Sequence, residues 1–141
     1  MDDQSNSLYS RTPEFADLLK ICESLNKQGA AYILIGGCAV ILHGGVRATK
    51  NIDFLVQSSV ENIRKIKKAL SVLPDNAASL LADDEVQQYQ VVRIGDEVVI
   101  DLMGAACGIR YEDAKDQIEW QVIEGVKIPL AGKKTLIRMK E

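Results

Sequence analysis

A short apolar run that ends in two glycines constrains this chain most. Ala31-Tyr32-Ile33-Leu34-Ile35 leads directly into Gly36-Gly37. An apolar run of this length, bounded by glycines, is typical of a buried strand that enters a tight turn. Residues 31–35 are therefore expected to form a buried strand.

Two other segments show helical spacing of their apolar residues, and the continuous apolar residues 38–42, which His43-Gly44-Gly45 closes, fit a short helix packed on the strand. The first is expected to have Thr12 as its N-cap, Pro13 in its first turn and Gly29 just after its end. Ser58 or Ser59 can cap a later helix, because serine side chains accept hydrogen bonds from free N–H groups of the first turn. The predicted helices cover residues 13–28, 38–42 and 60–73.

Strand-like runs occupy much of the remaining sequence. Apolar alternation predicts a strand over residues 51–56. Two hairpins are predicted, one turning at Gly95-Asp96 between residues 86–94 and 97–103, the other at Glu124-Gly125 between residues 118–123 and 126–128. Pro129 is expected to end the second. Residues 75–85 are expected to be a loop or weak helix, and residues 135–139 the opening turn of a last helix. The order indicates an α/β (α+β) fold, a mixed central sheet with helices packed on it.

Length and composition indicate one globular domain. A chain of 141 residues with 47% hydrophobic and 26% charged residues can bury a single core. Residues 1–11 are polar and aperiodic, so we expect a flexible N-terminus at 1–11 and a single domain over 12–141. No apolar stretch reaches the roughly 18 to 20 residues of a membrane span, and the first residues do not resemble a secretion signal. A cytoplasmic protein without a membrane partner is expected.

Charge gives a weaker indication of partners. The formal net charge is -3, so the surface as a whole would not attract nucleic acid. Two basic clusters are expected to be solvated helix faces. Trp120 and the tyrosines are too scattered for a base-stacking platform and are expected to pack in the core. The basic clusters are Arg64, Lys65, Lys67 and Lys68, then Lys133, Lys134, Arg138 and Lys140.

Polar residues in two predicted strands are the candidate site. Asn51 and Asp53 are two residues apart, so both project from one strand face and could reach one cation; the alternative is a polar strand end in solvent. Asp101 interrupts the apolar runs Val98-Val99-Ile100 and Leu102-Met103. A carboxylate there requires a metal ion or a cationic partner, unless the strand lies at a solvated edge.

Three short motifs resemble the nucleotidyltransferase superfamily, which has the fold of DNA polymerase β. In that pattern a Gly-Gly or Gly-Ser pair is followed by Asp-x-Asp or Asp-x-Glu and then by a lone acid in a later strand. His43-Gly44 and Arg47-Ala48-Thr49 stand in the order of the abortive-infection toxin type, and the resemblance spans residues 31–103. The three motifs are Ile35-Gly36-Gly37, Asn51-Ile52-Asp53-Phe54 and Ile100-Asp101-Leu102.

This resemblance implies residue roles. Gly36 and Gly37 would hold nucleotide phosphates, and Arg47 and Lys50 would either add positive charge there or lie in a surface loop. Asn51, Asp53 and Asp101 would be the catalytic and metal-binding residues for Mg²⁺ or Mn²⁺ carrying an NTP. Asp101 would also help to deprotonate an acceptor hydroxyl on RNA, a protein or a small molecule.

Asn51 departs from the family pattern. Its amide can ligate Mg²⁺ but brings no negative charge, so the site would hold metal less tightly. Three interpretations therefore stay open. The first is a weakened nucleotidyltransferase, and the second is a degenerate relative that binds a nucleotide, a protein partner or a second copy, for example in a toxin-antitoxin pair. The third is an α/β domain whose match to these motifs is accidental. His43, the one histidine, is interpreted as a helix-end residue in preference to a general base.

Overall fold

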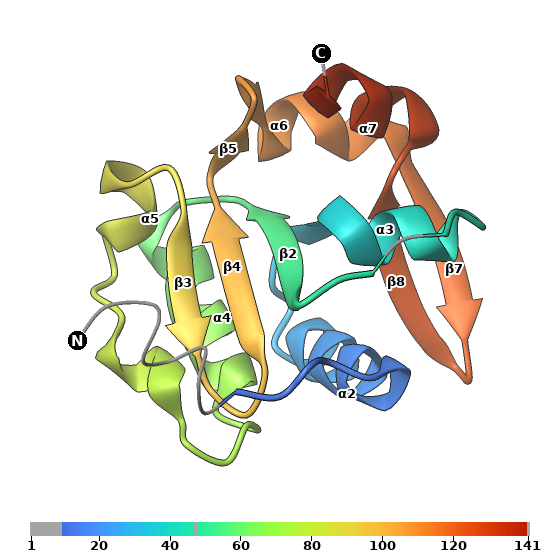
Figure 1. Cartoon of the computed structure of the whole chain (residues 1–141). Coiled ribbons are helices and arrows are strands. Elements are labelled where there is room, and N and C mark those ends of the chain that lie inside the picture. Colours follow the sequence, from blue (N-terminus) through green and yellow to red (C-terminus); the bar gives the residue numbers. More distant parts are fainter. Residues whose placement is uncertain (1–9, 47, 141) are drawn as a thin grey trace.

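A six-stranded mixed sheet forms the centre of the computed structural model, which describes residues 10–46 and 48–140. The strand order is β3-β4-β2-β1-β8-β7 (Figure 1). β2 lies antiparallel to β1 and parallel to β4, which confirms the predicted mixed sheet. The strands are β1 (Tyr32–Ile35), β2 (Asn51–Val56), β3 (Val92–Gly95), β4 (Val99–Met103), β7 (Ile118–Ile123) and β8 (Val126–Ala131), with β5 (Ala105–Ala106) and β6 (Ile109–Arg110) paired separately.

Helices pack on this sheet. None of those in the described part of the chain combines the length and apolar character that a membrane span requires. They are α2 (Phe15–Lys27), α3 (Gly36–Leu42), α4 (Val60–Leu70), α5 (Glu85–Gln88), α6 (Tyr111–Ala114) and α7 (Lys133–Lys140), with 3-10 turns η1 (Ala77–Leu80) and η2 (Lys115–Gln117).

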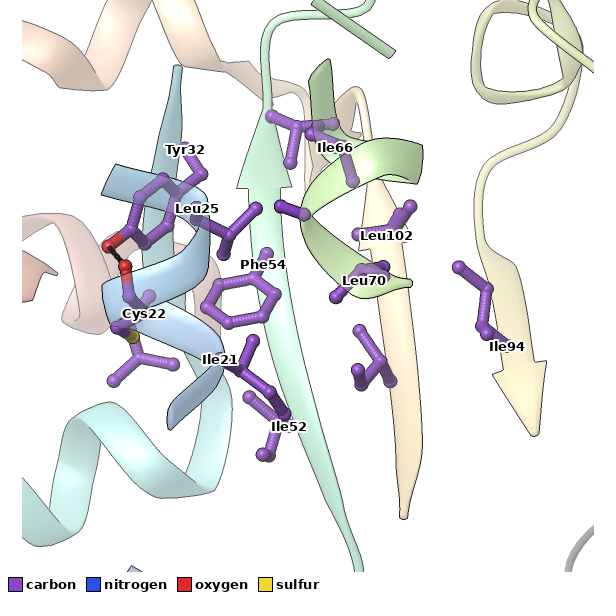
Figure 2. Close-up of a cluster of buried hydrophobic side chains, with 14 of the residues drawn as sticks. Ile21, Cys22, Leu25, Tyr32, Ile52, Phe54, Ile66, Leu70, Ile94 and Leu102 are labelled. Carbon is purple, nitrogen blue, oxygen red and sulfur yellow. Dashed lines mark hydrogen bonds between the residues drawn. The ribbon is translucent and has the colours of Figure 1, made fainter. Parts of the chain in front are cut away.

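The main core lies between one sheet face and helices α2 and α4. Alternation along β2 turns Ile52, Phe54 and Val56 toward these helices, and all three are buried. In Figure 2 the side chains of both helices gather around Phe54. Its ring meets Tyr32 edge to face, with the centroids 5.4 Å apart. Burial of this apolar face fixes which way β2 is turned.

The same alternation turns Asn51 and Asp53 to the opposite sheet face. That face carries a smaller apolar cluster that includes Ile33, Ile35 and Leu55. Residues of α6 and α7 pack against this cluster. The polar start of β2 therefore lies on the face that the main core does not cover.

Several predicted helix boundaries differ from the structure. α3 begins at Gly36 and not at residue 38, and α7 covers Lys133–Lys140, where an opening turn over residues 135–139 was expected. The N-cap of α2 is Glu14 and not Thr12, because the Asp17 carboxylate accepts the Glu14 backbone N–H at 2.7 Å. Ser59 caps α4 as predicted, since its hydroxyl accepts the N–H of Asn62 at 3.2 Å. α4 ends at Leu70, three residues earlier than expected.

Both hairpins form, with altered strand lengths. β3 begins at Val92 and not at residue 86, because residues 85–88 form the helical turn α5. β8 continues through Pro129 to Ala131, so the prediction that Pro129 ends it is wrong. Proline lacks one donor, but its fixed backbone angle is compatible with an extended strand.

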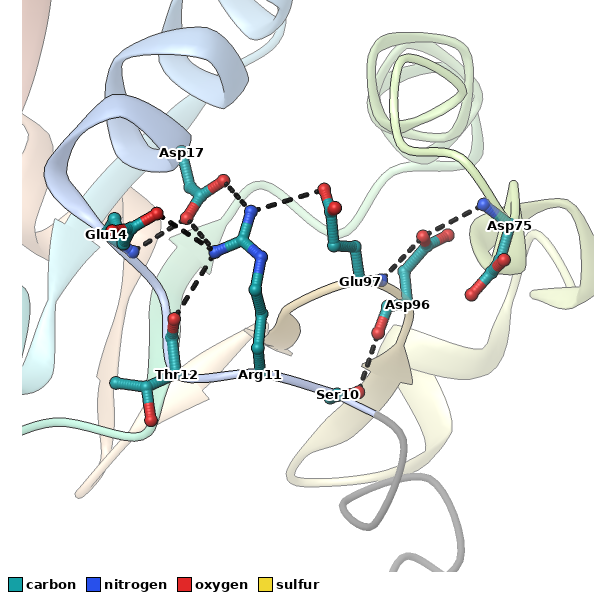
Figure 3. A network of polar contacts seen from close by, with 8 residues as sticks. All are labelled: Ser10, Arg11, Thr12, Glu14, Asp17, Asp75, Asp96 and Glu97. Atoms are coloured by element: carbon teal, nitrogen blue, oxygen red, sulfur yellow. Dashed lines mark hydrogen bonds and ion pairs between the residues drawn. The ribbon is translucent and has the colours of Figure 1, made fainter.

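Two residues of the predicted flexible terminus are held against the domain (Figure 3). Arg11 donates to both carboxylate oxygens of Asp17, each at 2.6 Å, and lies 3.3 Å from Glu97. Ser10 donates its hydroxyl to the carbonyl of Asp96 at 2.6 Å. The hydrogen bond from Arg11 lowers the pKa of Asp17. Residues 1–9 of the predicted terminus lie outside the described residues.

Candidate functional site

Parallel pairing of β2 and β4 places the two predicted carboxylates side by side. Asp53 is the register partner of Asp101, and Asn51 is the partner of Val99. Residues paired in register project from the same face of a sheet, so both aspartates share the face of Asn51. Asp101 is buried, with 5% of its surface exposed, whereas Asn51 and Asp53 are half-buried.

The side-chain amide of Asn51 joins the two carboxylates. Its Nδ2 donates to Oδ1 of Asp53 at 2.5 Å and to Oδ2 of Asp101 at 2.7 Å. The nitrogen faces both acids because the amide oxygen would be repelled there. Asn51 thus supplies two hydrogen bonds at the point where three of the predicted residues meet. A hydrogen bond from Thr49 to the Asn51 carbonyl, at 2.7 Å, fixes the start of this strand.

Arg93 is a site residue that the sequence analysis missed. It is the register partner of Asp101 on the neighbouring strand β3. Its Nε and Nη2 donate to the two oxygens of Asp101 at 2.9 and 3.1 Å. A carboxylate in an apolar strand requires a metal or a cationic partner, and Arg93 is the cationic partner of Asp101. Alternation along β3 was the sequence pattern that could have identified it. Arg93 lies between Val92 and Ile94, which are buried, so its side chain projects from the other face of the strand.

Gly36 lets the backbone approach Asp53 closely. It begins α3 with a φ of +70°, in the left-handed region that favours glycine. A Cβ at this position would overlap Oδ2 of Asp53 and lie 3.0 Å from its Cγ. The structure therefore places Gly36 beside the Asp53 carboxylate, while Gly37 is buried in α3.

The remaining predicted residues lie at or beyond the edge of this cluster. Lys50 is exposed and, together with Asn51 and Arg93, lines a pocket of about 310 Å³. Ser10, Arg11, Thr12 and Val99 complete its lining. Arg47 lies outside the described residues.

His43 is the C-cap of α3, and its Nε2 lies 2.9 Å from the carbonyl of Ala131, so it sits at a helix end as predicted. Trp120 is 61% exposed on β7 and Tyr89 is 59% exposed, so their expected place in the core is wrong, whereas Tyr32 is buried as expected.

Cys38 adds no nucleophile beside the cluster. Burial, together with the negative charge of Asp53, raises the pKa of its thiol to about 11. A thiol with this pKa stays protonated at neutral pH, and the thiolate is the reactive form. The chemistry available here is therefore that of carboxylates, an amide and a guanidinium.

The donor set fits one divalent cation better than two. Mg²⁺ takes one or two carboxylates together with water and substrate phosphates, and Asp53 and Asp101 provide two. Counted over the contacts of the described residues alone, Arg93 reduces their formal charge of -2 to -1, and Asn51 adds none. Among the described residues no group of three His, Cys, Asp or Glu side chains is arranged to hold a metal. A cation bound here would depend on phosphate oxygens as further ligands.

Comparison with known proteins supports the fold. No protein-family model matches the chain, and no curated protein matches it by sequence. The structure is similar to the crystal structure of a protein from Thermotoga maritima described as a "putative nucleotidyltransferase", with a TM-score of 0.60 and 15% identity. The match covers 87% of this chain and 80% of that one. The chain thus has a nucleotidyltransferase-like fold, and at this identity the likeness shows the fold alone.

Proposed function

We propose that this chain is a weakened nucleotidyltransferase, which transfers a nucleoside monophosphate from an NTP to an acceptor hydroxyl with Mg²⁺ or Mn²⁺. One observation carries the proposal. Asp53 and Asp101 stand in register on parallel strands, with Gly36 beside Asp53, in a fold similar to that of the Thermotoga maritima protein. Two carboxylates next to a backbone without a side chain suit a cation that carries a polyphosphate.

Each residue has a defined part in this proposal. Asp53 and Asp101 would hold the cation, which when bound neutralises phosphate charge and polarises the α-phosphate. Asp101 would also accept the proton of the attacking hydroxyl, whose oxygen bonds to the α-phosphorus as pyrophosphate leaves. Lys50, exposed at the rim of the pocket, would meet the outer phosphates. In-line transfer needs positioning and charge neutralisation more than covalent help, and these side chains supply both.

A second candidate function is a nucleotide-binding or partner-binding relative without turnover. The Asn51 bridge and the Arg93 ion pair favour it, because both satisfy the carboxylates without metal. The resemblance to abortive-infection toxins extends this candidate to a toxin-antitoxin setting, with a protein partner or a second copy of the chain.

Transfer assays separate the two functions. Purified protein is incubated with labelled NTPs, Mg²⁺ or Mn²⁺, and RNA, protein or small-molecule acceptors. The transferase predicts weak labelling by the wild type, stronger labelling by Asn51→Asp and none by Asp53→Asn. Asp116→Asn, at an exposed position outside the site, is the matched control and should behave as the wild type.

Absence of transfer by both the wild type and Asn51→Asp would reject the transferase. Calorimetry with the same NTPs then tests the second candidate. Nucleotide binding without turnover supports it, whereas a monomeric protein that binds neither nucleotide, metal nor partner removes it.

A further inference from the structure

We propose that Arg93 is a built-in counter-ion that competes with a divalent cation for Asp101 and so weakens metal binding at this site. The inference rests on the cation site of the proposed function. It assigns to Arg93, which lies outside the three nucleotidyltransferase-like motifs, the control of when that site accepts metal.

Backbone register gives Arg93 a fixed place at the cluster. Antiparallel pairing of β3 with β4 sets Arg93 directly opposite Asp101. Residues paired in this way have side chains within reach of each other on the same face. The two hydrogen bonds, from Nε and Nη2, engage both oxygens of the carboxylate. A metal ion that used either oxygen would have to share it with, or take it from, the guanidinium.

The two partners differ in exposure. The Asp101 side chain is 7% exposed and Arg93 is 34% exposed, so the carboxylate is fixed inside while the arginine reaches solvent. Arg93 also lines the 310 Å³ pocket with Lys50 and Asn51. The Arg93 guanidinium therefore borders this pocket while it is paired with Asp101, and a metal ion that took the carboxylate would leave the guanidinium facing the pocket.

Charge explains the competition. A buried carboxylate needs compensation, which either an arginine or a divalent cation can supply. With both present the site would hold +3 against the -2 of Asp53 and Asp101. With an aspartate at position 51 the acids would total -3 and could hold both. Asn51 and Arg93 therefore act in the same direction, and each reduces the attraction of the site for metal.

Metal titration without nucleotide tests this role. Mn²⁺ binding is followed by the loss of its free electron paramagnetic resonance signal, in the wild type, Arg93→Gln, Asp101→Asn and the double variant. We expect Arg93→Gln to bind Mn²⁺ at least about tenfold more tightly than the wild type, and we expect Asp101→Asn to abolish this gain. Arg64→Gln is the matched control, because Arg64 makes a similar 2.9 Å contact with Asp83 on the exposed surface. It should bind as the wild type does.

A second measurement covers the case in which Arg93→Gln does not fold. In the wild type the Nε–H signal of Arg93, assigned by comparison with Arg93→Lys, is followed by nuclear magnetic resonance during Mg²⁺ titration. Movement of this signal toward that of an exposed arginine supports competition.

Two results would overturn the proposal: an Arg93→Gln variant that binds Mn²⁺ no more tightly than the wild type, or an Arg93 signal that stays unmoved throughout the titration. Neither readout requires nucleotide transfer. A protein without transferase activity can therefore still show the competition, and an active one can lack it.

Discussion

Substitution of Gly36 by alanine tests how closely the α3 turn and the acidic strand are coupled. Two costs arise from the structure. Gly36 has a φ of +70°, and a left-handed backbone costs a residue with a Cβ about 1–2 kcal/mol. The new Cβ would also overlap Oδ2 of Asp53, so the carboxylate must move and give up its hydrogen bond from Asn51. A hydrogen bond to a charged group contributes about 1.5–3 kcal/mol.

The expected loss of unfolding free energy for Gly36→Ala is therefore about 2.5–5 kcal/mol. Gly29→Ala is the matched control, because Gly29 has a φ of +68° and a Cβ added there would meet no atom of the described residues within 4 Å. It should show the backbone cost alone, about 1–2 kcal/mol. Urea unfolding, with midpoint and slope fitted for each variant, measures both values.

The same two substitutions, Gly36→Ala and Gly29→Ala, are then made in a protein that also carries Asp53→Ala. Removal of the carboxylate removes the overlap with Oδ2 and Cγ and leaves only the Cβ of residue 53, 3.1 Å from the new Cβ, so the excess cost of Gly36→Ala over Gly29→Ala should shrink there. If the excess is absent in the wild-type background, or is undiminished in Asp53→Ala, the close approach of Gly36 to this carboxylate is refuted.

Three further predictions concern the hydrogen-bond network and its charges. Asn51→Asp should lower the melting temperature in the presence of a chelator, because three carboxylates then lie together and repel one another. Mn²⁺ should restore the melting temperature. A melting temperature that is unchanged in both conditions contradicts the site geometry. Asp17→Asn should lower the melting temperature at neutral pH. Arg11 lowers the pKa of Asp17 below 3.8, so the wild type should keep its higher melting temperature above that pH and lose it only as the pH falls beneath 3.8. Thermal unfolding of both proteins over a range of pH measures this difference. Asn62→Ala should lower the free energy of unfolding, measured in urea, by about 2–4 kcal/mol. The buried Asn62 side chain makes three hydrogen bonds, with the N–H and the carbonyl of Ala31 and with the carbonyl of Gln57. A loss below about 1 kcal/mol contradicts this prediction.

Local patterns were sufficient for much of the fold. The apolar spacing that predicted α2 and α4 corresponds to the faces that these helices bury. The alternation around Asp53 likewise predicted which strand face carries it. Both patterns are readable because burial selects side chains at the period of the element itself.

Register was not readable from local patterns. A two-residue turn at Gly95-Asp96 would pair Arg93 with Val98, whereas the observed pairing sets Arg93 against Asp101. The loop between β3 and β4 includes Asp96, which is buried and whose carboxylate accepts backbone N–H groups from η1 and its approach. The contact of Asp96 with residues 75 and 77, which are distant in sequence, thus accompanies a longer turn, and the longer turn sets Arg93 opposite Asp101.

The sequence by itself determined that an amide and two acids, at Asn51, Asp53 and Asp101, occupy strands whose other residues are apolar. Only the tertiary structure decided that β2 and β4 are parallel neighbours, that Asn51 joins the two acids, and that Arg93 pairs with one of them. The physical reason is that the face of a residue follows from the period of its own strand. Strand order and register instead follow from packing between segments far apart in the chain.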